Sequence, residues 1–293
     1  IDSEEEGILT VGCAGGRRAA CHIPVERNTQ TGILCHIRFS GLLGGHSGLE
    51  IHKKRGNGIE LLGRFLLFLK KETDYALISM SGGIKENAIP KDSRASVLIP
   101  EKNLSCAKKA AETFLSYIKS EYGAADPDIR LELTESTITT EAALTEKSLH
   151  SVLTALTFIP CGVQAMSADI PDTVETSLNL GIMELAEEEL TLRLSIRSSV
   201  SSAKEALADK IDLLIQNFRE TTLHGHMQRN LPFETAVLKF SKTNTEKPRS
   251  FRPFMQDLNA ESSPAKSLDW TVSPLVQISL MFILRTKNFI FPL

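Results

Sequence analysis

The sequence predicts an α/β protein of the α+β kind, in which one continuous antiparallel sheet has helices on one face. Two observations predict this fold. Between about residues 32 and 218, short apolar strand-like segments alternate with longer segments of helical periodicity. In addition, the order strand, helix, strand, strand, helix occurs twice at similar length, and short connections of this kind favour antiparallel neighbours in one sheet.

The first unit contains five predicted elements and one glycine-rich loop. The segments in order are a strand at 33–39, the loop at 41–48, a helix at 58–71, strands at 76–80 and 95–99, and a helix at about 103–122. Apolar residues three and four apart identify the first helix: Leu61, Leu62, Phe65, Leu66 and Leu69. These side chains predict a buried helix face.

The second unit repeats the order of the first. A strand at 129–133 alternates apolar and polar residues, a helix covers 146–158, and a hairpin has arms at 178–185 and 190–195. A helix at about 202–217 ends the unit. After Phe218 neither periodicity is sustained, which predicts a poorly ordered, partly apolar stretch.

Composition excludes several classes of protein. The 293 residues are 42% hydrophobic and 24% charged, as in an ordinary globular protein, and the net charge of −3 gives no reason to expect nucleic acid or an anionic membrane as partner. The five cysteines are scattered without C-x-x-C spacing, which argues against a disulfide framework and for the reducing cytoplasm. The longest late apolar run, Val276 to Leu284, is too short to span a bilayer.

Four phrases carry chemistry. They are Asp-Ser-Glu-Glu-Glu-Gly at 2–7 with Val-Gly-Cys-Ala-Gly-Gly at 11–16, Gly-Leu-Leu-Gly-Gly-His-Ser-Gly at 41–48, Gly-Gly at 82–83 leading to Asn-Ala-Ile-Pro at 87–90, and Ile-Arg-Ser-Ser at 196–199. Together they resemble the aminoacyl-histidine dipeptidases, a branch of the co-catalytic zinc exopeptidases with a large lid domain. The resemblance covers about residues 1–217, and its most specific part is the glycine-rich phrase around His46.

The resemblance implies a role for four residues. Asp2 matches a carboxylate that binds one of two zinc ions, whereas an Asp at a strand end is otherwise a cap or turn residue. His46 matches a lid histidine that reaches the partner subunit's site and stabilises the oxyanion, although a lone loop histidine is commonly a solvated surface residue. Asn87 and Arg197 match substrate-binding lid residues, Arg197 being suited to a substrate carboxylate. Their alternatives are a turn former and an exposed strand residue.

The resemblance also implies the function and the partners. We expect a metallo-dipeptidase that hydrolyses Xaa-His dipeptides through a water activated by two zinc ions, with cobalt or manganese as possible replacements. The lid would form a homodimer in the cytoplasm, and neither nucleic acid nor membrane is expected as partner. The domains would be 1–16, the end of a first catalytic segment; 17–217, the lid; and 218–293, a remnant of a second catalytic segment.

Most of the expected metal ligands are missing from the chain as written. In the family a His, a bridging Asp and a Glu precede the position of Asp2, and another His lies near the C-terminus, so a single carboxylate should leave the chain inactive. The start inside an acidic phrase without Met suggests missing upstream sequence. Read from the third nucleotide of each codon, residues 254–286 permit phrases like the family's H-A-G and H-S-P, which predicts a frameshift near Phe218. Alternatives are a non-catalytic dimerising lid and a pseudogene product.

Overall fold

The computed structural model describes residues 14–218 together with three short strands at 8–10, 238–241 and 251–253. The chain divides into two compact units, Ile1–Asp257 and Leu258–Leu293, and every described residue belongs to the first. The predicted tail and its frameshift therefore lie mostly outside the described residues. The three short strands β1 (Ile8–Thr10), β12 (Leu238–Ser241) and β13 (Phe251–Pro253) form an antiparallel sheet of their own in the order β1-β12-β13.

The main sheet of the described residues is antiparallel, as the sequence predicts, and contains eight strands, of which β2 and β9 were not predicted. Its order is β2-β11-β10-β5-β7-β3-β8, and β9 pairs with β10 beside this path. The bounds are β2 Gly15–Pro24, β3 Arg27–Ser40, β5 Ala76–Gly82, β7 Ser93–Ile99, β8 Arg130–Leu144, β9 Gly162–Met166, β10 Val174–Leu185 and β11 Glu189–Ser198. A separate two-stranded sheet joins β4 (Gly45–His46) to β6 (Ala88–Ile89).

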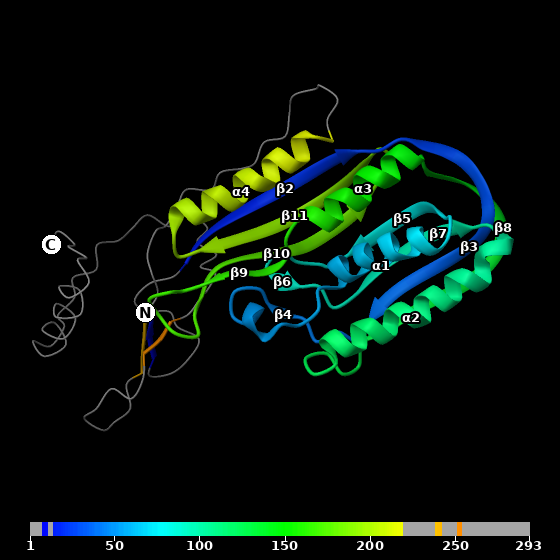
Figure 1. Cartoon of the computed structure of the whole chain (residues 1–293). Coiled ribbons are helices and arrows are strands. Elements are labelled where there is room, and N and C mark those ends of the chain that lie inside the picture. Colours follow the sequence, from blue (N-terminus) through cyan, green and yellow to red (C-terminus); the bar gives the residue numbers. More distant parts are fainter. Residues whose placement is uncertain (1–7, 11–13, 219–237, 242–250, 254–293) are drawn as a thin grey trace, which may run out of the picture. The chain divides into compact units, whose positions relative to one another are not determined.

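Four α-helices lie on one face of the main sheet (Figure 1), which confirms the predicted layering. They are α1 Gly58–Glu72, α2 Leu104–Tyr122, α3 Glu146–Phe158 and α4 Ser201–Gln216, with short 3₁₀ turns at Ile51–Lys53 and Glu101–Asn103. None of these helices is long and apolar enough to cross a membrane. The side chains of Asn57 and Thr145 cap α1 and α3 by accepting backbone N–H groups of their first turns.

The core forms between the helices and this face of the sheet. Strand β11 shows why: its apolar residues alternate with polar ones and are all fully buried, namely Leu190, Leu192, Leu194 and Ile196. The predicted apolar face of α1 is buried as well. Phe65 of this helix packs at 5.3 Å from Phe114 of α2 and at 6.3 Å from Phe39 of β3, measured between ring centroids. Each such fully buried side chain contributes about 1.5–3 kcal/mol.

The structure extends the sequence prediction at the sheet edges. β8 is fifteen residues long, where the alternating pattern predicts only 129–133, because its second half is exposed and rich in threonine. Among the described strands β8 pairs with β3 alone and forms one edge of the sheet. β2, the other edge, was not predicted, and it begins at Gly15, inside the segment assigned to residues 1–16. Those domain boundaries stay a prediction.

Gly63 lies where α1 crosses α3, and a larger side chain there should destabilise the fold. An added Cβ would lie 2.8 Å from Leu156 Cβ, an atom close to the backbone that cannot move aside easily. For Gly63→Ala, overpacking of about 1–3 kcal/mol should outweigh the gain of about 1 kcal/mol in helix propensity. Urea unfolding should therefore show a lower midpoint for Gly63→Ala. The control Ser116→Ala, at an exposed position of α2, should leave it unchanged or slightly raised, and a stabilised Gly63→Ala would contradict this packing.

Candidate functional site

Two of the predicted site residues, His46 and Asn87, lie side by side. His46 of β4 pairs with Ala88 of β6, and the backbone N–H of Ser47 donates to the carbonyl oxygen of Asn87 at 2.9 Å. Both His46 and Asn87 are partly exposed. The hydroxyl of Ser47, the residue after His46, is buried and has no hydrogen-bond partner within the described part of the chain. Two loops separated by some forty residues thus form one polar surface.

Glycines 44 and 45 make this pairing possible. Gly44 has φ +63° and Gly45 has φ +137°, values that residues with a Cβ rarely adopt. A Cβ on Gly44 would lie 2.7 Å from the carbonyl oxygen of Ile89, and one on Gly45 would lie 2.5 Å from the Glu50 carboxylate. The glycine-rich phrase therefore lets β4 approach both β6 and Glu50 closely.

A buried carboxylate fixes both ends of the loop that contains His46. Asp126 is fully buried, and its two oxygens accept the N–H of Leu43 at 2.7 Å and the N–H of Gly56 at 2.6 Å. Leu43 precedes His46 and Gly56 follows it, so one side chain closes residues 43–56 into a ring. Two short hydrogen bonds to a charged acceptor make this a strong anchor.

A second polar anchor holds the loop that contains Asn87. The side-chain amide of Asn179, in β10, donates to the carbonyl oxygens of Glu86 at 2.8 Å and Ala88 at 2.9 Å, on either side of Asn87. Asn57, at the start of α1, donates to the carbonyl of Leu180 at 2.9 Å. The beginning of α1, strand β10 and the Asn87 loop are therefore tied together by two asparagines.

Apolar contacts support the two loops that contain His46 and Asn87. Ile51, Ile89 and Val174 form a small buried cluster apart from the main core, with Ala14 and Val163 packed against it. Ile51 follows the His46 segment, Ile89 belongs to β6 and Val174 opens β10. This cluster packs under both paired loops at the end of the sheet and restricts their movement.

Arg197 lies in β11, on the sheet face opposite the helices. Its neighbours Ile196 and Leu194 face the helix core, so the alternation of the strand turns Arg197 and Ser195 the other way. Ser195 is the register partner of Asn179, and Arg197 lies two residues further on, about 7 Å along the strand. Arg197 is only 3% exposed, so the alternative of an ordinary exposed strand residue does not hold. The structure thus places it near Asn179, whose side chain holds the Asn87 loop.

Further charges surround the Asn87 loop. The carboxylate of Glu86 lies 3.4 Å from Arg18 Nε and 3.7 Å from Arg193 Nη1. Arg193 shares the face of Arg197 by alternation, and Arg18 is the register partner of Ser195. This face is therefore rich in guanidinium groups, which suits an anionic group such as a substrate carboxylate.

The predicted metal ligand Asp2 lies outside the described residues. Within residues 14–218 no group of three or more His, Cys, Asp or Glu could hold a metal ion. Three other histidines of the described residues have ordinary partners or exposure: His36 contacts the Ser96 hydroxyl at 3.1 Å, His22 contacts Glu189 at 2.7 Å, and His150 is exposed. The described part of the chain therefore does not by itself form a metal site.

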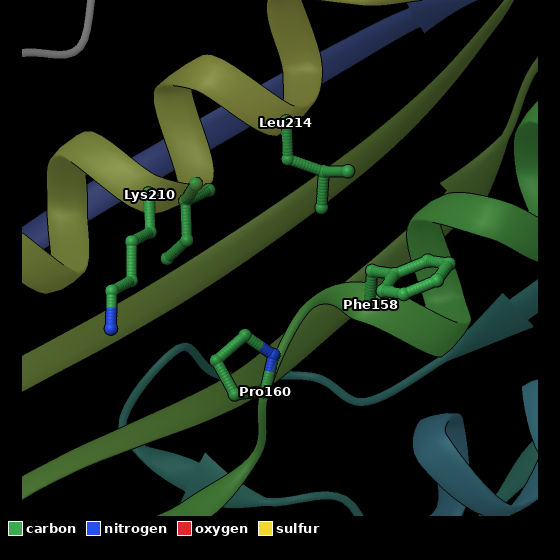
Figure 2. Close-up of a pocket in the computed structure, with 5 residues that line it drawn as sticks. Phe158, Pro160, Lys210 and Leu214 are labelled. Carbon is green, nitrogen blue, oxygen red and sulfur yellow. The ribbon is translucent and has the colours of Figure 1, made fainter.

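A shallow cavity of about 260 Å³ opens between the end of α3 and α4. Figure 2 shows its lining, which is formed by Phe158, Pro160, Lys210, Ile211 and Leu214. The lining is apolar apart from Lys210, and none of the predicted site residues belongs to it. It offers no pair of groups for acid–base or nucleophilic chemistry, so the candidate site is the loop surface instead.

Sequence reasoning missed Asp126, Asn179 and Glu50. Asp126 and Asn179 act on backbone groups far away in the sequence, which leaves no motif, and Asp126 looks like a turn residue before Pro127. Glu50 contacts the backbone of His46 and follows it by four residues in a segment without helical periodicity. Asn57 alone had a local signal, because an asparagine directly before a helical pattern is a preferred N-cap.

The chain is similar to known peptidases. Residues 37–126, which include His46 and Asn87, match the family model described as a peptidase dimerisation domain. The chain is 33% identical over 215 residues, 73% of its length, to the cytosol non-specific dipeptidase of Escherichia coli. It also resembles the crystal structure of aminoacylhistidine dipeptidase from Vibrio alginolyticus, with a TM-score of 0.70 and 31% identity over 74% of the chain. The chain spans 44% of the length of each of these two proteins.

The Asp126 anchor can be tested by a change that keeps its shape. In Asp126→Asn, one carboxylate oxygen becomes an NH₂ group, so the N–H of either Leu43 or Gly56 faces a donor and loses its acceptor. A buried amide left unpaired costs about 1–3 kcal/mol. Urea unfolding should show a loss of this size, and hydrogen exchange at Leu43 and Gly56 should quicken more than in the sheet.

The matched control is Asp128→Asn, two residues further on at an exposed position. It should change neither the unfolding free energy nor the exchange of the two amides. Unchanged exchange in Asp126→Asn would show that the carboxylate does not anchor the loop.

Proposed function

We propose that this chain is the lid part of a metallo-dipeptidase that hydrolyses Xaa-His dipeptides, and its similarity to two dipeptidases supports this. The observation that carries the proposal is the pairing of β4 with β6, which places His46 beside Asn87. One relative is named an aminoacylhistidine dipeptidase and the other a non-specific dipeptidase. The preference for a C-terminal histidine is therefore the finer part of the proposal. The cytoplasm is the proposed location, in keeping with the name of the E. coli relative.

The chain's own residues would bind and orient the dipeptide. His46 would donate a hydrogen bond to the oxyanion that develops when water attacks the peptide carbonyl. Arg197 would hold the substrate carboxylate, where a planar guanidinium can form two parallel hydrogen bonds, and Asn87 would contact the substrate beside His46. Anchors on both loops mean that these groups would need little reorganisation during the reaction.

Zinc, or cobalt or manganese in its place, is the proposed cofactor, and it would supply the activated water. Asp2 is the one proposed ligand in this chain. Since one carboxylate cannot hold a catalytic zinc ion, we expect the 293 residues alone to show neither stoichiometric zinc nor turnover. Under the frameshift hypothesis, the last expected ligand, the His of an H-S-P phrase, would be encoded in another reading frame of the tail.

The second candidate function is a non-catalytic homodimer of the lid. It is favoured by the match to a peptidase dimerisation domain and by β8, which pairs only with β3 among the described strands and exposes the apolar side chain of Ile138. An unpaired edge strand is a ready surface for pairing with a second copy. The same dimer would also serve the first candidate, because the resemblance assigns His46 to the partner subunit's site.

A chimera tests the catalytic proposal. Residues 15–217 of this chain would replace the matching segment of the E. coli relative, and hydrolysis of Xaa-His and of other dipeptides would be measured with zinc present. In this chimera His46→Ala should lower kcat by about 100-fold or more, as expected for the loss of an oxyanion donor. Arg197→Lys should mainly raise KM, because a lysine cannot form the two parallel hydrogen bonds.

The control is His36→Ala, which removes an exposed histidine from the sheet and should leave kcat within twofold. An active chimera that tolerates His46→Ala would contradict the catalytic proposal. An active chimera that hydrolyses dipeptides without histidine equally well would contradict only the proposed preference for histidine.

The dimer can be tested on the chain itself. Ile138 is 62% exposed on β8, and Ile138→Lys places a charge at the edge, which natural sheets use to prevent pairing. Light scattering after gel filtration should show a dimer for the unmodified chain and a monomer for Ile138→Lys. Ile84→Lys, at an 86% exposed position away from β8, should remain a dimer. A monomeric unmodified chain, or a dimeric Ile138→Lys, would rule out pairing through this edge.

A further inference from the structure

The ring of His46 is held by a backbone amide that follows it in the chain. The N–H of Leu49 donates to His46 Nδ1 at 3.2 Å. A backbone amide can only donate, so Nδ1 must present its lone pair to it. In a neutral imidazole one nitrogen accepts and the other has the hydrogen, which places the hydrogen of His46 on Nε2.

Glu50 closes the turn that brings this amide to the ring. Its Oε2 accepts the N–H of His46 at 2.9 Å, and its own N–H donates to the His46 carbonyl oxygen at 2.9 Å. Residues 46–50 therefore form a closed turn with Leu49 inside it. A Cβ on Gly45 would collide with the Glu50 carboxylate, which explains why glycine precedes His46.

Two basic side chains hold the Glu50 carboxylate in place. Glu50 Oε1 lies 2.8 Å from Lys53 Nζ and 3.0 Å from Arg55 Nη1, and Arg55 also donates to the carbonyl of Gly44. The pKa of Glu50 is lowered to about 2, first by the hydrogen bond from Lys53, then by the His46 N–H and the charge of Arg55. Because this pKa is lowered, the turn's stabilisation is complete above about pH 4.5 and is lost as the pH falls towards 2.

We propose that Glu50 is a positioning residue that, through the amide of Leu49, fixes His46 as the neutral Nε2–H tautomer. In this form His46 acts as a hydrogen-bond donor from Nε2, the geometry an oxyanion requires, and not as a general base at that nitrogen. The link to the oxyanion rests on the proposed function, whereas the tautomer rests only on the contacts of the loop.

His22 provides an internal reference for the opposite tautomer. His22 Nδ1 lies 2.7 Å from Glu189 Oε1, and an ionised carboxylate can only accept a hydrogen bond. The neutral ring of His22 therefore has its hydrogen on Nδ1. The ring-nitrogen signals of His46 and His22 should therefore show opposite tautomers in the same spectrum.

The experiment is a long-range proton–nitrogen correlation spectrum of the full chain, labelled with ¹⁵N and measured where the rings are neutral. His46→Gln and His22→Gln assign the two sets of ring signals. We expect the Nε2–H pattern for His46 and the Nδ1–H pattern for His22. An Nδ1–H or tautomer-averaged pattern for His46 overturns the proposal.

Glu50 is tested by three variants. Glu50→Ala removes the acceptor for the His46 N–H, so the His46 signals should move to a tautomer average, with a smaller change in Glu50→Gln. An unchanged His22 pattern shows in each case that the fold persists. Glu121→Ala, which removes an exposed ion pair with Arg64, should leave His46 unchanged. A pure Nε2–H pattern in Glu50→Ala would show that Glu50 does not position the ring.

Activity separates this proposal from the catalytic one. In the active chimera, Glu50→Ala should lower kcat by about 10-fold to 100-fold with little change in KM, as expected when a donor is displaced by about 1 Å. If the spectra agree but His46→Ala leaves the chimera fully active, the tautomer stands and the oxyanion role fails. If Glu50→Ala averages the tautomer without lowering kcat, Glu50 has no catalytic consequence.

Discussion

The carboxylate of Asp126 is the interaction on which the candidate site depends. It accepts backbone N–H groups from both ends of residues 43–56, so the loop cannot move away from the sheet without breaking two buried charge-assisted hydrogen bonds. Only with these ends fixed can β4 pair with β6 and His46 lie next to Asn87. Asn179 does the same for the facing loop, through two carbonyl groups instead of two amides. The candidate site is thus held in place by two polar side chains that form hydrogen bonds with backbone groups.

The layering of the fold separates stability from function. On the helix side, the apolar half of β11 packs into the core, and the helices cover it completely. On the opposite side, the same strand presents Arg193, Ser195 and Arg197. One alternating strand therefore supplies both the core and the charged face near the Asn87 loop.

Much of the fold could be predicted from the sequence, because its helices have clear periodicity. The predicted helix at 146–158 coincides with α3, and the one at 58–71 differs from α1 by one residue. The second half of β8 was missed because an exposed edge strand needs no apolar alternation. β4 and β6 have two residues each and exist only through tertiary contacts. His46, Asn87 and Arg197 were proposed through motif resemblance, whereas Asp126 and Asn179 bind distant backbone groups and leave no local pattern.

An experimental structure of this chain is the most direct test of the account. It should show Asp126 within hydrogen-bond distance of the Leu43 and Gly56 amides, and His46 paired beside Asn87 with Nδ1 facing the Leu49 amide. An intact eight-stranded sheet with the His46 loop placed elsewhere would contradict the account, because it would show that the fold does not assemble the proposed substrate-facing surface.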